Sequence, residues 1–223
     1  MLDPSLTIDY LRPVAHGVVC ISRTFAAGGE QAGELVADRL GYRYVDGEIL
    51  ARAADTGDLD PATVADAEQR RSLARRLLEA IGEGIAMAPE AYAYLPPHET
   101  AAGPRQDVVR QLIREAIDQV AAEGEVVIVA HAASHALAGR QDVLRVIVTG
   151  STAGRAARVP RESDAGPDAA RRQVAESDRA RADYLSRFYD VSDEHATHYD
   201  VVVNTDKLTP AQAATIVVSA ATV

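Results

Sequence analysis

Residues 18–33 constrain the fold of this chain more than any other segment. Their sequence, VVCISRTFAAGGEQAG, starts with apolar and β-branched residues, passes through small residues and ends in a pattern typical of a helix start. A buried strand, a tight turn and a helix in this order bring backbone N–H groups and the positive end of a helix to one point. That arrangement favours an anion, so the sequence predicts a phosphate-binding turn.

The predicted turn lacks the lysine that such loops usually carry. The common pattern is G-x-x-x-x-G-K-[ST], in which the lysine binds phosphate and the hydroxyl binds Mg²⁺. When residues 21–33 are aligned with such a loop without gaps, Gly29 takes the place of the lysine and Gln31 that of the hydroxyl residue. The sequence therefore indicates a turn shaped for a nucleotide phosphate whose cation comes from elsewhere in the chain.

Length and composition favour one α/β domain that acts on a small molecule. The chain has 223 residues, of which 47% are hydrophobic and 4% aromatic, so its core is expected to consist of Val, Ile, Leu and Ala. A net charge of −10 argues against nucleic acid or an anionic membrane as a partner. We find no signal-peptide pattern and no apolar run of membrane-spanning length, and therefore expect a cytoplasmic protein. Cys20 is expected to be a buried thiol.

Short apolar runs alternate with amphipathic segments along the chain. The runs predict strands at residues 18–21, 42–45, 125–129, 143–148 and 201–203. Helices are expected at residues 30–40, 48–54, 107–122 and 210–219, and in most of 155–187. Thr209 is the expected N-cap of the last helix, and Val108 with Leu112 is expected on the apolar stripe of the third. Strands that alternate with helices predict a parallel five-stranded sheet flanked by helices.

Five short motifs occur in order along most of the chain. They are ISRTFAAGGE at 21–30, LGYRYVDGEIL at 40–50, VIVAHAA at 127–133, DRARADY at 178–184 and YDVVVNTD at 199–206. Each motif alone is weak, but their joint order resembles the cytidylate kinase-like family, a branch of the P-loop nucleoside monophosphate kinases. The resemblance implies a P-loop kinase fold, ATP and Mg²⁺ as cofactors, and a nucleoside monophosphate similar to CMP as the acceptor.

The resemblance also implies a single kinase-like domain over residues 1–223. Its expected parts are an N-terminal arm (1–13), a phosphate-loop region (14–55), a helical insertion on the acceptor side (56–105), a core segment (106–150), lid-like helices (151–190) and a C-terminal strand and helix (191–223). Breaks at Pro160 and Pro167 suit the tip of a lid. A homodimer is compatible with the acidic, Ala-rich helices but is not required by them.

The turn is the expected site for the nucleotide phosphates. By resemblance, nucleotide binding is assigned to Ser22, Ala26, Ala27, Gly28, Gly29, Glu30 and Gln31. The two glycines allow close backbone approach or a positive φ, and the alternative is a plain tight turn. Arg23, at the strand end, is the best local candidate for the missing cation, and the alternative is a surface ion pair with Glu30 or Asp46.

Eight arginines lie between residues 155 and 187, in a chain that is acidic overall. Related kinases use an arginine-bearing lid to screen phosphate charge and to exclude water. Because acidic residues are interleaved, a helix pair joined by salt bridges is the alternative for most of them. For Arg158 and Arg181 we favour phosphate contact, and with Arg23 and Asp178 they complete the predicted catalytic set. Asp178 is expected to orient Arg181 or to contact a base or a sugar.

The predicted substrate-binding residues are Asp46, Arg52 and His131. Asp46 follows the second strand, where it would hold Mg²⁺ through water or orient a hydroxyl, or else cap the next helix. Arg52 follows Asp46 at a spacing similar to that in pyrimidine monophosphate kinases, which implies a contact with the acceptor phosphate, and a solvated helix arginine is the alternative. His131 stands where related kinases have a substrate-binding arginine, with a hydrogen-bonded structural histidine as the alternative. Although His131 and His135 have a metal-ligand spacing, no further ligand lies nearby, and we expect no protein metal site.

The departures from the family pattern leave two functional hypotheses open. Ala26 and Ala27 replace a Gly-Ser pair, and His131 replaces an arginine. The first hypothesis is a phosphotransferase that moves the ATP γ-phosphate to a small acceptor, with a nucleotide as the acceptor that the resemblance implies. The second is a catalytically weak or inactive nucleotide-binding or interaction module on the same scaffold.

Overall fold

This computed structural model describes residues 16–46, 48–58, 106–129, 132–159 and 167–223. The chain divides into two compact units, Met1–Asp46 with Asp118–Val223 and Gly47–Ile117, and each unit is described here by itself. The expected N-terminal arm, most of the expected insertion, the expected lid tip and His131 lie outside the described residues.

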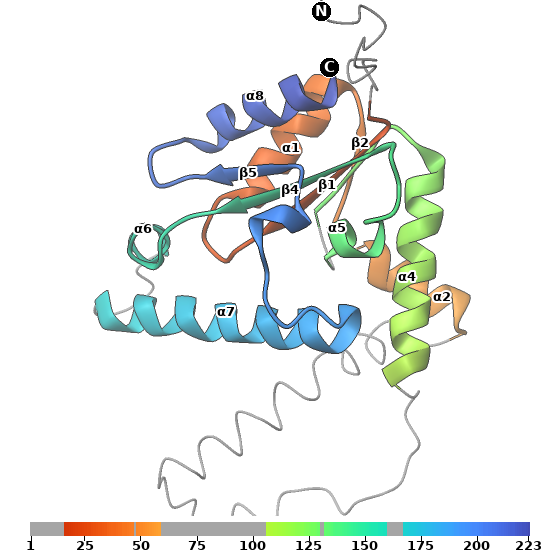
Figure 1. The fold of residues 1–223 in the computed structure, drawn as a ribbon, viewed down its shortest axis with the longest axis horizontal. Coiled ribbons are helices and arrows are strands. Elements are labelled where there is room, and N and C mark those ends of the chain that lie inside the picture. The colour runs from red at the N-terminus through yellow and green to blue at the C-terminus, as the bar shows by residue number, and fades with distance from the viewer. Residues whose placement is uncertain (1–15, 47, 59–105, 130–131, 160–166) are drawn as a thin grey trace, which may run out of the picture. The chain divides into compact units, whose positions relative to one another are not determined.

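The larger unit contains a five-stranded parallel sheet (Figure 1). Its strands are β1 (Val18–Arg23), β2 (Arg43–Val45), β3 (Val126–Ile128), β4 (Val143–Thr149) and β5 (Val201–Asn204). The strand order is β2-β3-β1-β4-β5, and every neighbouring pair is parallel. The residues of β1 from Val18 to Ser22 are buried, as expected for a central strand covered on both faces. The predicted α/β fold, a parallel sheet flanked by helices, is therefore confirmed.

Six helical segments accompany this sheet within the described part of the larger unit. They are α1 (Gly29–Leu40), α5 (Ala133–Ala136), α6 (Thr152–Arg158), α7 (Pro167–Tyr189), the 3-10 helix η2 (Ala196–His198) and α8 (Pro210–Ala221). The predicted N-cap of α8 is confirmed, because Thr209 and Gln212 form a reciprocal capping box. No described helix has the length and the apolar character needed to cross a membrane.

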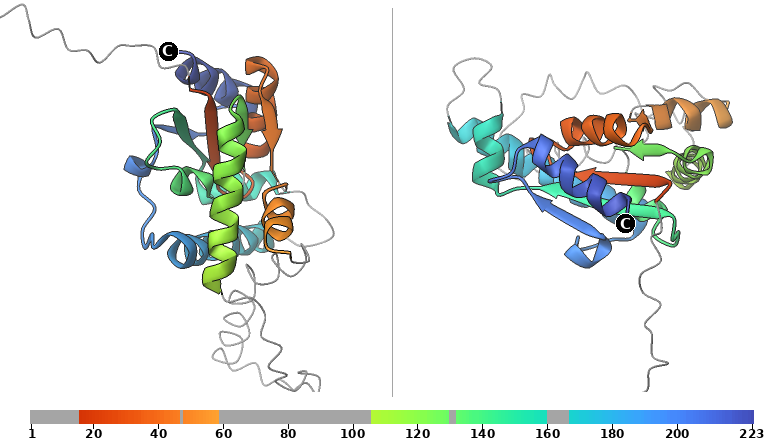
Figure 2. Two further views of the ribbon diagram at one scale, coloured as in Figure 1. Left: turned by 90° about the vertical axis from the view of Figure 1, so that its right-hand side faces the viewer. Right: turned by 90° about the horizontal axis from the view of Figure 1, so that it is seen from above.

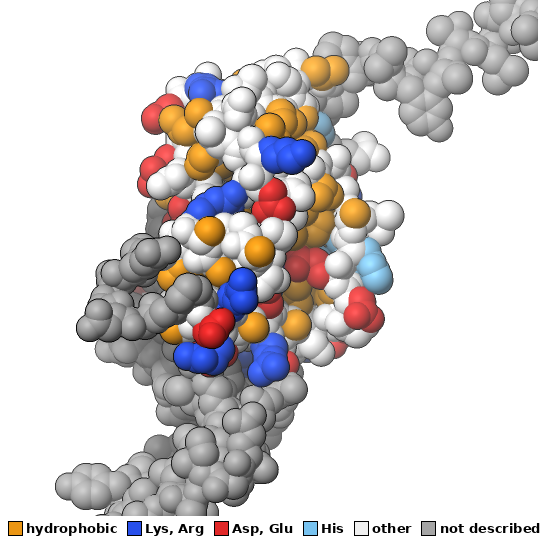
Figure 3. Space-filling view, turned by 90° about the vertical axis from the view of Figure 1, so that its left-hand side faces the viewer, with side chains coloured by type: hydrophobic (Ala, Val, Ile, Leu, Met, Phe, Trp, Pro, Cys, Tyr) orange, Lys and Arg blue, Asp and Glu red, His pale blue; other side chains and the backbone are white. Residues whose placement is uncertain are grey.

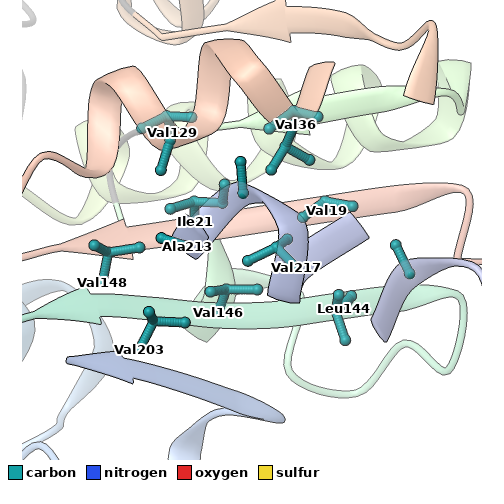
Figure 4. Close-up of a cluster of buried hydrophobic side chains, with 14 of the residues drawn as sticks. Val19, Ile21, Val36, Val129, Leu144, Val146, Val148, Val203, Ala213 and Val217 are labelled. Atoms are coloured by element: carbon teal, nitrogen blue, oxygen red, sulfur yellow. The ribbon is translucent and has the colours of Figure 1, made fainter. Parts of the chain in front are cut away.

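The two faces of β1 pack against different helices. Val19 and Ile21 point toward α1 and α8, in a core cluster that includes Val36, Val146 and Val217 (Figure 4). The alternate residues Cys20 and Ser22 lie on the face that α5 covers, as the two-residue period of a strand requires. The same division is visible from the side and from above (Figure 2), where α1 and α8 accompany one face of the sheet.

Gly33 explains how closely α1 lies against the sheet. A Cβ atom at this position would lie 2.5 Å from Cγ2 of Val129, which is closer than real carbon atoms approach. Only glycine is therefore compatible with this helix position unless the backbone moves. Close packing of α1 fixes the start of the helix at the carboxyl end of β1.

The described part of the smaller unit contains α2 (Glu48–Thr56) and most of α4 (Gln106–Glu123), which continues into the larger unit. The prediction that Val108 belongs to the apolar stripe of α4 is wrong, because Val108 is 47% exposed while Val109 is buried. The stripe begins at Val109 and continues through Ile113 and Ile117 at the four-residue spacing of one helix face.

Candidate functional site

The candidate site is built around the β1–α1 turn, defined as residues 24–28. β1 extends two residues beyond the predicted strand, so that Arg23 is its last residue, and α1 begins at Gly29. Two residues of the turn have left-handed backbone conformations, with φ of 59° at Ala26 and 78° at Gly28. The positive φ that the sequence suggested for a glycine here is present at Gly28, while Ala26 holds a conformation that costs L-residues about 1–2 kcal/mol.

Every backbone carbonyl from Arg23 to Gly28 accepts a hydrogen bond. Two of these bonds are local, from Ala27 N–H to Thr24 O and from Ala32 N–H to Gly28 O, each 3.1 Å. The other four come from side chains: Arg181 Nη1 to Arg23 O (3.3 Å), Arg155 Nη1 to Phe25 O (3.3 Å), Arg158 Nη1 to Ala26 O (3.4 Å) and Thr205 Oγ1 to Ala27 O (3.0 Å). Three arginines from α6 and α7 therefore lie on the carbonyl side of the β1–α1 turn.

The N–H groups of the same segment behave differently. Within the described part of the chain, several of them donate no hydrogen bond, namely those of Phe25, Ala26, Gly28, Gly29, Glu30 and Gln31. The last four belong to the start of α1, where a helix has no acceptors of its own, and Gly28 provides no side-chain cap. The N–H side of the turn therefore presents a group of donors near the positive end of α1.

Gly29 is sterically coupled to Arg23. A Cβ atom at Gly29 would lie 2.5 Å from Cβ and 3.1 Å from Cδ of Arg23, so any side chain there, a lysine included, collides with the arginine stem. Arg23 Nε lies 2.5 Å from Oε1 of Glu30, which is the ion pair that we considered as an alternative. The N–H bond of Nε does not point at the carboxylate, so this nitrogen makes no hydrogen bond. Arg23 thus takes the space that the usual lysine needs.

Arg155 is a site residue that sequence reasoning missed. It is 4% exposed, and its guanidinium donates to Gly150 O at 2.9 Å, to Phe25 O at 3.3 Å and to both carboxylate oxygens of Asp178 at 2.8 and 2.6 Å. A buried charge needs this degree of hydrogen bonding to offset its lost hydration. Nothing in the sequence distinguishes Arg155 from the other arginines of its run, since its burial arises from the packing of α6 against α7.

The expected pairing of Asp178 with Arg181 is wrong. Asp178 binds Arg155, whereas Arg181 donates to both oxygens of Glu194, at 2.9 and 2.5 Å, and to the Tyr199 hydroxyl at 3.3 Å. The two residues are three apart on α7, but their side chains reach carboxylates on different segments. Both contacts therefore join the middle of α7 to the carbonyl side of the turn, Asp178 through Arg155 and Arg181 directly.

Glu194 lies at the centre of a polar cluster that the sequence did not predict. The Tyr199 hydroxyl donates to its carboxylate, and Nε2 of His135 lies 3.9 Å from its Oε1 and 3.2 Å from the hydroxyl oxygen. Burial alone would raise the pKa of Glu194, but His135, Arg181 and Tyr199 together hold this pKa well below its usual range. Burial and the neighbouring carboxylate raise the pKa of Tyr199, so its hydroxyl stays protonated.

Ser22 and Arg158, two of the predicted site residues, differ in their burial. Ser22 is 5% exposed and its hydroxyl donates to Ser134 Oγ at 3.1 Å, beneath α5. Arg158 is exposed overall, and its guanidinium donates to the hydroxyl and the carbonyl of Thr205 and to the carbonyl of Ala26. Thr205 is itself buried, so Arg158 closes over a polar contact that joins β5 to the turn.

A cavity of about 150 Å³ borders the carbonyl side of the turn. Its polar lining consists of Thr24, Arg155, Asp178, Arg181, Ser192 and Glu194. Both arginines in this lining are already paired with carboxylates, so the cavity carries no uncompensated positive charge. On the molecular face that carries α6, Lys and Arg side chains alternate with acidic ones and form no single basic patch (Figure 3).

The acceptor-side predictions are less well defined. Asp46 is half-buried directly after β2, at the carboxyl edge of the sheet where Arg23 also lies. Arg52 is on α2 in the smaller unit, and His131 lies outside the described residues. Among the residues that the structure describes, no group of three or more His, Cys, Asp or Glu side chains is arranged to hold a metal ion.

Solved structures that are similar to this chain include the following three. A crystal structure of an uncharacterized protein from Eubacterium ventriosum is similar, with a TM-score of 0.60 at 15% identity, and the match covers 91% of this chain and 96% of that chain. Shikimate kinase from Bacteroides thetaiotaomicron gives a TM-score of 0.47 at 13% identity, with 91% and 94% covered. TT1252 from Thermus thermophilus gives 0.45 at 16% identity, with 91% and 96% covered. No curated protein matches the chain.

The family assignment comes from a comparison with family models. The model of the cytidylate kinase-like family matches residues 18–207, a span that begins at β1 and ends just after the Thr205 contact with the turn. The five motifs quoted above lie within that span, so the resemblance inferred from them is confirmed. The chain belongs to the cytidylate kinase-like family.

Proposed function

We propose that this protein is a phosphotransferase that binds ATP at the β1–α1 turn and transfers the γ-phosphoryl group to a nucleoside monophosphate. Phosphoryl transfer requires an in-line arrangement and neutralisation of charge, and it needs no covalent protein nucleophile. In the transfer, the bond from the γ-phosphorus to the β–γ bridging oxygen breaks and a bond to an oxygen of the acceptor phosphate forms. The family assignment supports the nucleotide-kinase scaffold, and the acceptor class rests on the resemblance.

The observation that carries the proposal is the division of the turn into two sides. All carbonyls from Arg23 to Gly28 are bonded on one side, while the N–H groups of Ala26, Gly28 and Gly29 donate to none of the described residues. Donors that converge beside a helix N-terminus bind phosphate oxygens. A turn whose acceptors are all satisfied by the protein repels an anion less, because its carbonyl dipoles point away from the ligand.

Arg23 is proposed as the cation that replaces the missing lysine. Its stem fills the space above the Cα atom of Gly29, and among the described residues its guanidinium is paired with Glu30. Both side chains of this pair are accessible, at 31% and 48%, so a phosphate can compete for the guanidinium at small cost. We also keep Arg158 as a phosphate ligand, since its side chain is exposed overall and its bonds go to the neutral oxygens of Thr205 and Ala26.

The remaining predicted residues are assigned by their position at the sheet edge and by resemblance. Asp46, which follows β2, is proposed to hold Mg²⁺ through water, because Mg²⁺ in such sites keeps several waters and binds one or two carboxylates. The ion would neutralise charge on the nucleotide phosphates. Arg52 and His131 are proposed to contact the acceptor. We expect the enzyme to work in the cytoplasm.

A second candidate function is a nucleotide-binding module with weak or no catalysis. The observation that favours it is that Arg155 is paired with Asp178 and Arg181 with Glu194. In these pairs the two guanidinium groups do not point toward a ligand on the N–H side of the turn. On this account the turn holds a nucleotide, but the lid does not assemble around the transferred group.

The two functions are separated by measuring binding and turnover on the same preparation. ATP is titrated calorimetrically with and without Mg²⁺, and ADP formation is then followed with CMP, UMP, AMP and GMP as acceptors. Mg²⁺-dependent binding together with ADP formed on one acceptor supports the phosphotransferase. Tight binding without turnover on any acceptor supports the module, and an absence of ATP binding contradicts both.

The role of Arg23 is tested with a matched pair of variants. Arg23→Ala should lower turnover about 10²- to 10³-fold, the usual loss for one preorganised charge-stabilising group. Arg39→Ala is the control, since Arg39 lies on the same helix as Glu30 and, among the described residues, bonds to Ala211 and Thr215 of α8. Equal rates for the two variants would remove Arg23 from the site.

A further inference from the structure

Arg155 and Asp178 form the most deeply placed ion pair of the candidate site. Arg155 is the one buried charged side chain among the residues that the structure describes, and it holds three separate segments together. These segments are the end of β4 through Gly150 O, the turn through Phe25 O, and α7 through Asp178. A charge that is costly to bury is retained when its geometry serves a purpose, so its contact with the turn calls for an explanation.

The planarity of the peptide bond supplies that explanation. In a trans peptide the carbonyl of one residue and the N–H of the next point in opposite directions. A donor that holds Phe25 O on one side therefore directs the N–H of Ala26 to the other side. In the same way, the bond from Thr205 to Ala27 O directs the N–H of Gly28 away from Thr205.

The conformation of Ala26 strengthens this argument. A residue with a side chain rarely adopts a φ of 59° unless its surroundings impose it. The carbonyls on both sides of the Ala26 Cα atom, those of Phe25 and Ala26, are the ones held by Arg155 and Arg158. The arginines are thus placed to keep an otherwise strained turn in the shape that exposes its donors.

We propose that Arg155 and Asp178 are a positioning pair, which holds the β1–α1 turn from its carbonyl side so that its N–H groups face the nucleotide phosphates. This proposal rests on the proposed function, because it assigns a role within the same nucleotide site. Arg155 does not contact the phosphates. Asp178 acts one step further away, by fixing the planar guanidinium through both of its oxygens at 2.8 and 2.6 Å.

The pair also explains how the turn works without its lysine. The lysine of an ordinary loop brings a positive charge to the phosphates from the N–H side. Here the side chain of Arg155 reaches the back of the turn, where the guanidinium polarises the Phe25–Ala26 peptide and strengthens its N–H as a donor. The two roles of Arg155, its charge and its orientation of the turn, can be separated by a lysine at this position. Lysine keeps the positive charge but lacks the planar guanidinium that binds two carboxylate oxygens and a carbonyl at once.

The test compares ATP affinity among variants of the full chain at a temperature where circular dichroism shows each variant to be fully folded. Asp178→Asn is expected to weaken ATP binding about 10- to 100-fold, because the loss of one well-directed hydrogen bond to a charged phosphate changes affinity by about that much. Glu176→Gln, an exposed change two residues earlier on α7, is the matched control and should bind ATP like the wild type. Asp178→Glu, which restores the carboxylate, should regain most of the affinity.

Arg155→Lys separates orientation from charge and also covers the case in which Asp178→Asn does not fold. Loss of ATP affinity in Arg155→Lys, with changed amide signals of Ala26 and Gly28 in NMR spectra, supports the positioning role. A merely structural pair would lower the midpoint of thermal unfolding in these variants and leave the ATP affinity of the folded protein unchanged, which overturns the proposal. If the wild type itself does not bind ATP, the proposed function fails together with the pair. If the wild type binds ATP and both folded variants bind it equally well, only the pair fails.

Discussion

The two sides of the β1–α1 turn differ in how completely the protein satisfies them. On the carbonyl side, each oxygen from Arg23 to Gly28 accepts a hydrogen bond, four of them from side chains. On the N–H side, the groups at the start of α1 donate to none of the described residues. A turn that is fixed from one side and open on the other is shaped before a ligand arrives. Its cations lie mainly behind it, opposite to where a lysine would stand.

The largest expected effect comes from breaking the carbonyl side at its buried point. Arg155→Ala removes the donors of Phe25 O and Gly150 O and leaves Asp178 without its partner. We expect the free energy of unfolding to fall by about 3 kcal/mol, the lower range for a broken buried ion pair, because Asp178 is 37% exposed and regains water. Urea denaturation followed by circular dichroism measures the change.

Arg171→Ala is the control for that measurement, since Arg171 is 65% exposed and its contact with Asp168, at 3.8 Å, is loose. This variant should stay within about 0.5 kcal/mol of the wild type. Equal losses for Arg155→Ala and Arg171→Ala would mean that the carbonyl side is not held by Arg155.

The next largest effect is expected on the N–H side, at the contact between Gly29 and Arg23. Gly29→Ala places a methyl group 2.5 Å from the Arg23 Cβ atom and should destabilise the fold by about 2 kcal/mol, as overpacking does. Arg23→Gly should remove most of that penalty when the two changes are combined, because the colliding stem is gone. Gly139→Ala is a matched control with open space around it. Additive effects of the two changes would contradict the steric coupling.

A smaller and pH-dependent effect is expected at Glu194, where the carbonyl side is held through Arg181. The pKa of Glu194 is lower in the folded protein than its ordinary value of 4.5, so protonation favours the unfolded chain. The stabilisation is complete above about pH 4.5 and is lost as the pH falls toward the folded-state pKa. Glu194→Gln should therefore cost about 1–3 kcal/mol at neutral pH, and that difference from the wild type should shrink in acid. Denaturation curves between pH 3 and pH 7 test this, and a constant difference would contradict it.

The smallest effect is expected at the exposed rim of the carbonyl side. Arg158→Ala removes hydrogen bonds to Thr205 and Ala26 from an arginine that is exposed overall. These are hydrogen bonds between an exposed side chain and neutral acceptors, whose net contribution is small, so the free energy of unfolding should fall by less than about 1 kcal/mol. Thermal unfolding measures this, and a loss as large as that of Arg155→Ala would remove the distinction between the buried anchor and the rim.

The sequence predicted the framework of the site because that framework is local. Strand, turn and helix at residues 18–33 follow from apolar runs and small residues, and the cap at Thr209 follows from its own motif. The ends of the strands differ from prediction by one or two residues. The difference matters at Arg23, which belongs to β1 and therefore has its side chain fixed beside Gly29.

The partners of the arginines were not predictable because they depend on packing. Arg155 and Asp178 are far apart in the sequence, and their contact requires α6 to lie against α7. Asp178 is nearer to Arg181 in the sequence, but Arg181 bonds to Glu194 instead. Glu194 lies beyond the end of α7, in the segment that folds back against the helix. Tyr199 belongs to a recognised motif, yet its contact with Glu194 becomes apparent only in three dimensions.

The most direct test of the central claim is the response of backbone amide signals in NMR spectra to ADP with Mg²⁺. If the N–H side of the turn binds nucleotide phosphates, the signals of Ala26, Gly28 and Gly29 should shift far more than those of Gly41 and Gly124, which have positive φ values at other turns. Saturable shifts confined to the first group are the result that we predict. If ADP binds while these three signals stay in place, the nucleotide site lies elsewhere in the chain and the account is contradicted.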